Sequence, residues 1–302
     1  MAENLYQTVH IGRNGQQFSV FLTKTRSMRT PSFLTVSILF VSILVSCTSS
    51  AEKKAQSDFQ RAEAMVANRD LSTAMQLLDS MMVWNKDNFG IVGEALKRRN
   101  KIANEYHQGV INVSKTLLSG LESRMPELIK DFRFTPGDGS QTGIYEHKRQ
   151  TVENSWNRTF LKIGLNENGE VWLVSHYYGQ SWIDHTSLRV YDKDNYLLTD
   201  TIPLGHEWNR KVEDQGDRWE TIEFREGSDA GAIAFIADNY QKPVKARLTG
   251  KTFYYIVLES YDKDAIRKGW ELAQVLKERY GLRQAILLHQ AELRKLGVAT
   301  GS

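Results

Sequence analysis

The sequence predicts an α+β protein in which an N-terminal helical hairpin and a long helix precede an antiparallel β-rich domain and a C-terminal helix. Two changes of period predict this order. Apolar residues recur every three or four positions over residues 55–134, alternate over residues 144–260, and return to a helical period over residues 261–297. Helices and an antiparallel sheet in separate parts of a chain are typical of the α+β class.

The composition is that of an ordinary folded protein, with 302 residues of which 41% are hydrophobic and 25% are charged. Four of the 39 basic residues and one of the 36 acidic residues lie in the first 46 positions, so the rest of the chain has no net charge. A neutral chain gives no electrostatic reason to expect nucleic acid as a partner.

Residues 28–46 have the order of a secretory signal peptide. Arg29 supplies the positive end, and the thirteen residues 33–45 carry no charge. Such a run is too short to cross about 30 Å of hydrocarbon as a permanent helix, but it fits the apolar centre of a signal peptide. Since a start at Met28 gives the signal a normal size, we interpret residues 1–27 as a non-physiological extension.

The only cysteine of the chain, Cys47, follows Leu44, Val45 and Ser46. This order resembles the lipobox of bacterial lipoproteins, and the resemblance implies that Cys47 is acylated and becomes the first residue of the mature protein. Residues 47–54 are then a short tether. Thr48 follows the cysteine where an Asp would favour retention in the inner membrane, so the resemblance implies the outer membrane, facing the periplasm.

A helical bundle is expected over residues 55–134, and it begins with a hairpin. Ala62 and Met65 share one apolar face, Ala74 and Leu78 share the next, and Asp70 stands at the break between them. The pair resembles one tetratricopeptide-type unit. No second unit follows at the expected spacing of about 34 residues, so we expect these faces to form a core and not a peptide-binding groove.

A longer helix completes the predicted bundle. Its apolar stripe runs from Val92 to Leu128 and shifts by one position near Leu121, as a four-residue stutter does in a coiled coil. Gly120 and Pro126 are expected to bend or break this helix.

Residues 135–143 are rich in turn-forming residues and are the predicted linker to a β-rich domain at residues 144–260. Hairpin turns between the strands predict one antiparallel sheet. A helix is expected over residues 228–240. The predicted strands cover residues 161–165, 171–178, 188–191, 196–202, 219–224, 244–248 and 253–258. Residues 261–297 form the C-terminal helical segment, which Gly281 is expected to divide.

Three histidines of the β-rich domain, His176, His185 and His206, are weak candidates for a metal site. Their spacing matches no zinc motif, so no metal and no cofactor are expected. Ser175 is a poor nucleophile candidate because no Gly-x-Ser-x-Gly turn surrounds it, and no glycine-rich phosphate loop occurs. The sequence assigns no catalytic residue.

The candidate ligand-binding residues lie in one segment between two predicted strands: Tyr178, Gln180, Trp182, Asp184 and His185. Loops are usually polar and exposed, so aromatic side chains there suggest a stacking platform with polar groups beside it. The alternative is a structural turn in which Trp182 closes the end of the sheet.

The whole chain is similar to uncharacterised bacterial lipoproteins that combine a lipobox, a tetratricopeptide-like hairpin and a β-rich C-terminal domain, a resemblance that implies no activity. We expect a non-enzymatic binding or scaffold protein of the cell envelope. Its expected partners are the membrane, through acylated Cys47, and another envelope protein or a glycan. The alternatives are a carbohydrate-binding β domain and a metal-dependent hydrolase.

Overall fold

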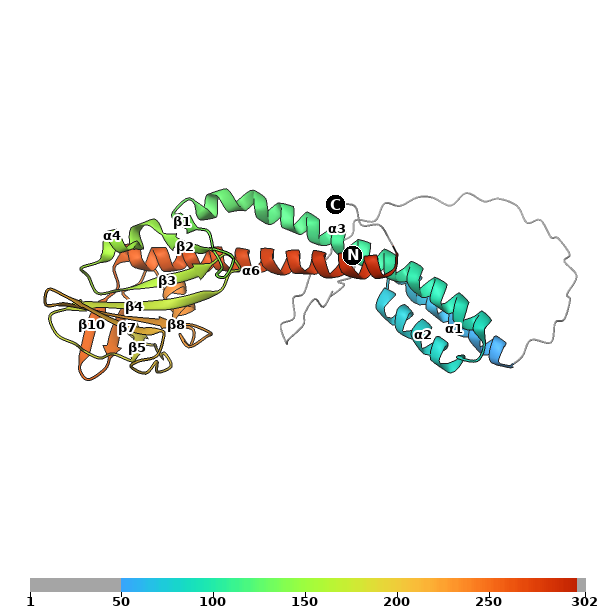
Figure 1. Cartoon of the computed structure of the whole chain (residues 1–302), viewed down its shortest axis with the longest axis horizontal. Helices are drawn as coiled ribbons and strands as arrows, with labels where there is room; N and C mark the ends of the chain where they lie inside the picture. The colour runs from blue at the N-terminus through green and yellow to red at the C-terminus, as the bar shows by residue number, and fades with distance from the viewer. Residues whose placement is uncertain (1–49, 298–302) are drawn as a thin grey trace, which may run out of the picture. The chain divides into compact units, whose positions relative to one another are not determined.

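The computed structural model describes residues 50–297 and confirms the α+β architecture (Figure 1). The predicted signal peptide, its upstream extension and Cys47 lie outside these residues. The described chain divides into two compact units, one of residues 50–111 and 288–297, the other of residues 112–287. None of the helices within residues 50–297 is long and apolar enough to cross a membrane.

The first unit is helical. It contains α1 (Ser50–Ala67), α2 (Leu71–Trp84), the first half of α3 (Phe89–Ile129) and the end of α6 (Ser260–Lys295). Asp70 caps α2, because its carboxylate accepts a hydrogen bond of 3.2 Å from the backbone N–H of Thr73. The hairpin predicted at this break is confirmed, and its apolar faces pack with α3 around Ala74, Leu78 and Ala95.

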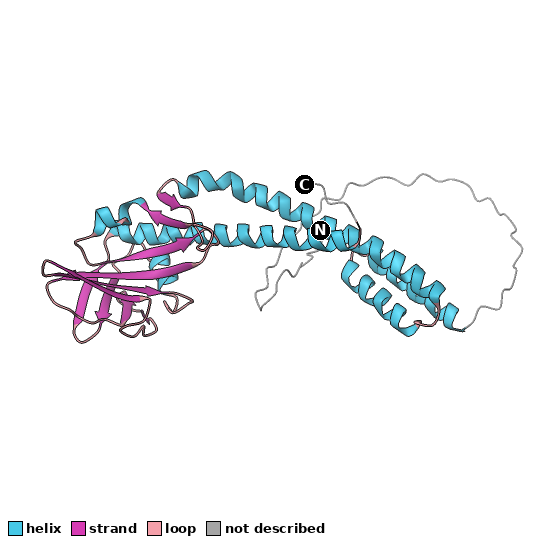
Figure 2. Ribbon diagram, viewed as in Figure 1, coloured by secondary structure: helices cyan, strands magenta, loops and turns pink. Residues whose placement is uncertain are grey.

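The second unit contains two antiparallel sheets, not the single sheet expected (Figure 2). The larger one has the order β1-β2-β3-β4-β8-β7. Its strands are β1 (Phe132–Thr135), β2 (Ile144–His147), β3 (Phe160–Asn166), β4 (Val171–Gly179), β7 (Asn209–Asp214) and β8 (Asp217–Phe224). The short helices η1 (Lys148–Gln150) and α4 (Val152–Ser155) connect β2 to β3.

The smaller sheet has four strands in the order β10-β9-β5-β6. They are β5 (Ser187–Tyr191), β6 (Tyr196–Leu198), β9 (Lys245–Thr249) and β10 (Phe253–Val257). The helix expected at residues 228–240 is α5 (Ala232–Asp238), and Asp229 accepts a hydrogen bond from the backbone of Ile233 in its first turn.

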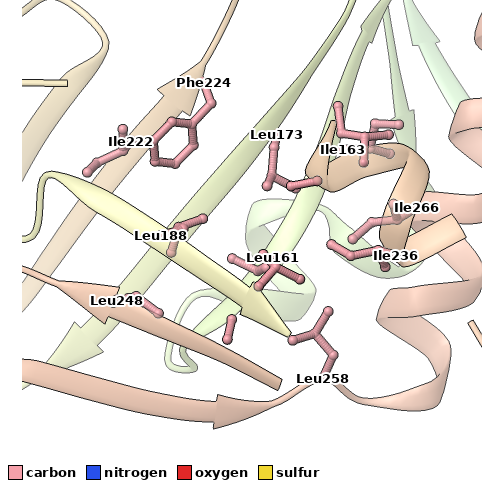
Figure 3. Close-up of a cluster of buried hydrophobic side chains, with 14 of the residues drawn as sticks. Leu161, Ile163, Leu173, Leu188, Ile222, Phe224, Ile236, Leu248, Leu258 and Ile266 are labelled. Carbon is pink, nitrogen blue, oxygen red and sulfur yellow. The ribbon is translucent and has the colours of Figure 1, made fainter. Parts of the chain in front are cut away.

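The main core fills the space between the two sheets and is closed by α5 and the first turns of α6. Figure 3 shows Leu161 and Leu173 of the larger sheet facing Leu188 and Leu248 of the smaller one. Helix α6 approaches β3 so closely that a Cβ atom on Gly269 would lie 2.5 Å from the side chain of Ile163. Glycine at this position permits the contact.

Several local expectations differ from the structure. Residues 135–143 were predicted as a linker between domains. Thr135 instead ends β1, and residues 136–143 join β1 to β2, which are paired strands of one sheet. Helix α6 continues through Gly281, and α3 continues through Gly120 and Pro126. In these helices, packing outweighs the local cost of glycine and proline: Met125 of α3 and Leu282 of α6 share a buried cluster with the sheet.

Candidate functional site

The segment of predicted ligand-binding residues is the connection between the two sheets, running from the end of β4 to the start of β5. Its aromatic side chains do not form one platform. Tyr178 packs against Trp219 of β8, with 5.6 Å between ring centroids, whereas Trp182 lies beneath the ammonium group of Lys211 at 4.2 Å. The side-chain amide of Gln180 donates to Asp217 at 2.7 Å.

Asp184 is buried in this connection and is fully engaged. Its carboxylate pairs with the ammonium groups of Lys211 and Lys251, and hydrogen bonds from both lysines hold the pKa of the Asp184 carboxyl below its usual value. Its backbone adopts a left-handed conformation with a φ of 53°. The contacts of Asp184 thus fix the turn itself.

His185, the last candidate of the segment, forms a hydrogen-bonded row with Ser175 and Glu220. The Oγ atom of Ser175 lies 2.9 Å from Nε2 of His185, and Nδ1 of His185 lies 2.7 Å from Oε2 of Glu220. Because an ionised carboxylate only accepts hydrogen bonds, Nδ1 donates to Glu220. In the neutral imidazole, Nε2 then accepts the hydroxyl proton of Ser175.

Glu220 also binds the backbone of the connection. Its Oε1 atom accepts the N–H groups of Ile183 and Asp184, both at 2.8 Å, and Oε2 accepts the N–H of His185 at 2.9 Å. Burial by itself raises the pKa of the Glu220 carboxyl, but the hydrogen bonds from His185 and Asp184 outweigh burial and hold the pKa below its usual range. We call Ser175, His185 and Glu220 the buried clasp.

The buried clasp has the order of a hydrolase triad: hydroxyl, imidazole, carboxylate. Its position does not suit catalysis. Ser175 lies in the middle of β4 on the face that carries Leu173 and Tyr177 into the core, and its exposed fraction is 0%. A nucleophile must reach the substrate carbonyl, so we interpret these three residues as a structural element that joins the two sheets.

The sequence predicted no contact between Ser175 and His185 and assigned no role to Glu220. Pairing of β4 with β8 brings Glu220 opposite Tyr177, next to the connection that follows β4. The 35 positions between His185 and Glu220 leave no local signal of this contact.

The three histidines proposed as weak metal candidates do not converge. His176 points to the outer face of the larger sheet, where it contacts Thr221, whereas His185 belongs to the clasp on the inner face. His206 accepts a hydrogen bond from the backbone of Trp208 and packs against its ring. Within residues 50–297, no group of three or more His, Cys, Asp or Glu residues could hold a metal ion.

The outer face of the larger sheet carries charges that are paired. Two ion-paired groups lie on it: Arg210 and Arg225 with Glu223, and Arg133 and Lys162 with Glu146. A cleft of about 550 Å³ beside the first group is lined by Trp208, both of its arginines and the β1–β2 loop. None of the predicted ligand-binding residues lines this cleft.

An aromatic cluster lies on the same outer face. Trp156 is 42% exposed and packs on Trp219, with 4.6 Å between ring centroids. Tyr178 also packs on Trp219, with 5.6 Å between ring centroids. The indole N–H of Trp219 donates to the carbonyl of Trp156 at 2.8 Å. Trp156 is therefore held in place although its ring is accessible.

The outer face of the smaller sheet was not singled out by the sequence. Leu188, Val190, Ala246 and Leu248 point inward and are fully buried, so the alternating residues of β5 and β9 point outward. These outward residues include Arg189, Arg247 and Lys245. Large apolar side chains flank them on the two edge strands: Phe253, Tyr255 and Val257 on β10, and Tyr196 and Leu198 on β6, each more than half exposed. We call these eight residues the cationic face.

Two arginines of the cationic face stand directly opposite each other, since Arg189 and Arg247 are partners in the β5–β9 register. Their guanidinium groups lie over rings at the edges, Arg189 at 4.1 Å from Tyr196 and Arg247 at 4.6 Å from Phe253. Among the described residues, neither forms an ion pair, and the Nε atom of Arg189 is buried without a hydrogen-bond partner.

The second unit, called the β unit below, therefore contains two distinctive polar groups. One is the buried clasp, whose members hydrogen-bond to one another, and the other is the cationic face, whose three cations form no ion pair among residues 50–297. A search of protein families finds no matching model, and comparisons with curated proteins and with solved structures find no similar protein.

Proposed function

We propose that this chain is a lipid-anchored, non-enzymatic protein of the bacterial cell envelope whose β unit binds an acidic partner protein through the cationic face. The observation that carries the proposal is the pair Arg189 and Arg247, which face each other and form no ion pair within the described residues. Like charges directly opposite each other destabilise a sheet, so an acidic partner would remove a cost that the isolated protein bears.

The composition of the cationic face supports a protein partner. Tyrosine and arginine are the residues that most often dominate the binding energy of protein interfaces. Each guanidinium group offers a planar fork of donors that matches a carboxylate in two parallel hydrogen bonds. Leu198 and Val257 add aliphatic surface, which suits a protein surface better than it suits a sugar ring.

The buried clasp supports binding in preference to hydrolysis. Ser175 has no exposed surface, and the carboxylate of Glu220 accepts hydrogen bonds from three backbone N–H groups of the connection between the sheets. These contacts make the β unit a rigid support for an outer surface, since they fix one sheet on the other.

Membrane anchoring rests on the lipobox-like sequence at Cys47, which lies outside the described residues. Acyl chains on this residue would hold the protein to the outer membrane, because each buried methylene contributes about 0.8 kcal/mol. The Cys47→Ala variant should accumulate as an unprocessed precursor. Wild-type protein that fractionates as a soluble periplasmic protein without detergent would contradict the anchoring.

The binding proposal is tested by charge reversal. Full-length protein carrying Arg189→Glu and Arg247→Glu is compared with wild type by cross-linking in the envelope of the bacterium that produces it. The matched control is Lys115→Glu with Arg124→Glu, two exposed cations of α3 that change the net charge equally. We expect a specific adduct in wild type and in the control, weakened by salt, and none in the Arg189 and Arg247 variant. Equal behaviour of the two variants would refute the proposal.

A glycan is the second candidate ligand, and the exposed Trp156 ring favours it. Trp156 is held on Trp219 beside Tyr178, which presents a firm aromatic surface of the kind that stacks on sugar rings. Trp156→Ala should then reduce retention on envelope glycans while the charge reversal on the smaller sheet leaves that retention unchanged.

A further inference from the structure

The two sheets have four edge strands, and they differ in how their edges are protected. Strand β7 carries Arg210, Lys211, Glu213 and Asp214, and β1 carries Arg133, whereas β6 has only three residues. Strand β10 has five residues, Phe253–Val257, and none of them is charged. Charged or very short edge strands resist pairing with another chain, and β10 has neither protection.

The backbone of β10 offers a complete set of hydrogen-bonding groups at its free edge. The N–H of Leu258 donates to the carbonyl of Val244, and the N–H of Gly250 donates to the carbonyl of Thr252. Since hydrogen bonding to one neighbour alternates along an antiparallel strand, Tyr254 and Ile256 also face β9. The N–H and C=O groups of Phe253, Tyr255 and Val257 therefore point away from the sheet.

We propose that β10 pairs antiparallel with β10 of a second copy of this chain, about a two-fold axis at Tyr255, so that the two smaller sheets become one continuous sheet. In this register Tyr255 exchanges two hydrogen bonds with Tyr255 of the second copy. Phe253 and Val257 likewise exchange hydrogen bonds across the axis. The free backbone groups of the edge are then satisfied.

The side chains of β10 are self-complementary in this register. On the outer face Tyr255 meets Tyr255, and Phe253 meets Val257; on the inner face Tyr254 meets Ile256. Aromatic and β-branched pairs stabilise antiparallel strands, and no like charges oppose each other. A charged strand with this symmetry would place identical charges near the axis, so the neutrality of β10 favours a second copy.

The arginines do not oppose this assembly. In the row across the joined sheet, Arg247 of each copy is separated from its equivalent by three inter-strand steps of about 4.8 Å. The resulting distance of about 14 Å exceeds the Debye length of about 8 Å at physiological salt, so their repulsion is largely screened. The assembly would place two cationic faces side by side, although it does not depend on the partner proposed for that face.

The proposal is tested by cross-linking in full-length protein that carries Cys47→Ser, which removes the only native thiol. In detergent solution, the Tyr255→Cys variant should form a disulfide-linked dimer when the thiol oxidant diamide is added. Hydrogen-bonded antiparallel partners have Cα atoms about 5.5 Å apart, which a disulfide can bridge. The matched control is Val212→Cys, an exposed valine on the charged edge strand β7, which should form no disulfide-linked dimer.

The register of the pairing is tested by Phe253→Cys, because Phe253 lies on the same edge strand as Tyr255 and has a similar exposed fraction. Because only the residue on the axis meets itself, Phe253→Cys should cross-link at least about tenfold more slowly than Tyr255→Cys. Equal cross-linking at the two positions would overturn the proposed pairing.

Sedimentation provides a measurement that does not need a disulfide. Wild-type chain should dimerise reversibly on concentration, and Tyr255→Lys should raise the dissociation constant at least about tenfold while circular dichroism shows the same fold. If Tyr255→Lys does not fold, Phe253→Lys takes its place. A wild-type chain that stays monomeric throughout the dilution series, with Tyr255→Cys no faster to cross-link than Val212→Cys, would refute the inference.

Discussion

The β unit contains two groups of polar side chains that differ in how far their charges are paired. In the buried clasp, Glu220 is surrounded by donors and its carboxylate is fully satisfied. On the cationic face, Arg189 and Arg247 are register partners with aromatic rings beside them, and neither forms an ion pair within the described residues. The difference separates polar groups that stabilise the fold from polar groups available to a partner.

The largest expected effect is on the clasp. Glu220→Ala removes the carboxylate that accepts three backbone N–H groups and the His185 ring, and it leaves these donors buried without partners. We expect the free energy of unfolding to fall by about 3–5 kcal/mol in urea titrations. Ser175→Ala removes one hydroxyl at the end of the same row and should cost only about 1 kcal/mol.

This pair of variants also tests the structural interpretation of the clasp. A hydrolase would lose activity on ester or peptide substrates in Ser175→Ala without losing stability. Glu220→Ala protein as stable as wild type would show that the clasp does not join the sheets.

A smaller effect is expected from His176, which is half-buried on the outer face of the larger sheet without an acid beside it. Burial lowers its pKa from 6.5 to about 4, although the Trp156 carbonyl acts in the opposite direction. Because the folded protein resists protonation that the unfolded chain accepts, stability is full above pH 6.5 and falls as the pH drops from about 6.5 to about 4. The loss amounts to about 3 kcal/mol.

The measurement compares urea unfolding of wild type and His176→Gln at pH 7 and at pH 4.5. Burial also lowers the pKa values of His107, His147 and His289, so both proteins should lose stability in acid. The contribution of His176 is the difference between their losses. Identical pH dependence of the two proteins would contradict its assignment to His176.

The smallest expected effect is on the cationic face. Arg247→Thr removes one of two opposed like charges and leaves a residue with good strand propensity. Thermal unfolding at low salt should place this variant within about 0.5 kcal/mol of wild type. A loss as large as that of Glu220→Ala would mean that the arginine row stabilises the fold and is not reserved for a partner.

Local patterns predicted the helices and most strands correctly because neighbouring residues decide them. The helical periodicity around Ala74 and Leu78 and the Asp70 cap each act over a few positions. Strands β1, β2 and β7 were not predicted. The sequence of β7, Asn-Arg-Lys-Val-Glu-Asp, lacks the apolar alternation of a half-buried strand. Pairing with β8 decides the conformation of β7.

The candidate site was less accessible to the same reasoning. Tyr178, Trp182 and His185 lie within eight positions of one another, which suggested one platform. Tyr178 packs on β8, Trp182 lies beneath Lys211, and His185 is buried against Glu220, so their neighbours in space are residues from other strands. Sequence proximity on a connection between two sheets does not establish a shared surface.

By itself, the sequence determined the α+β class, the helical hairpin and the alternation that divides each strand into a buried and an exposed face, because periodicity is a local property of the chain. The lipobox-like order at Cys47 is likewise a property of adjacent residues. Tertiary structure decided the rest: the separation into two sheets, the contact of Glu220 with His185, the register that places Arg189 beside Arg247, and the edge position of β10. Each depends on which strands pair, and pairing follows from burial of the whole core between the sheets, a property of no single segment.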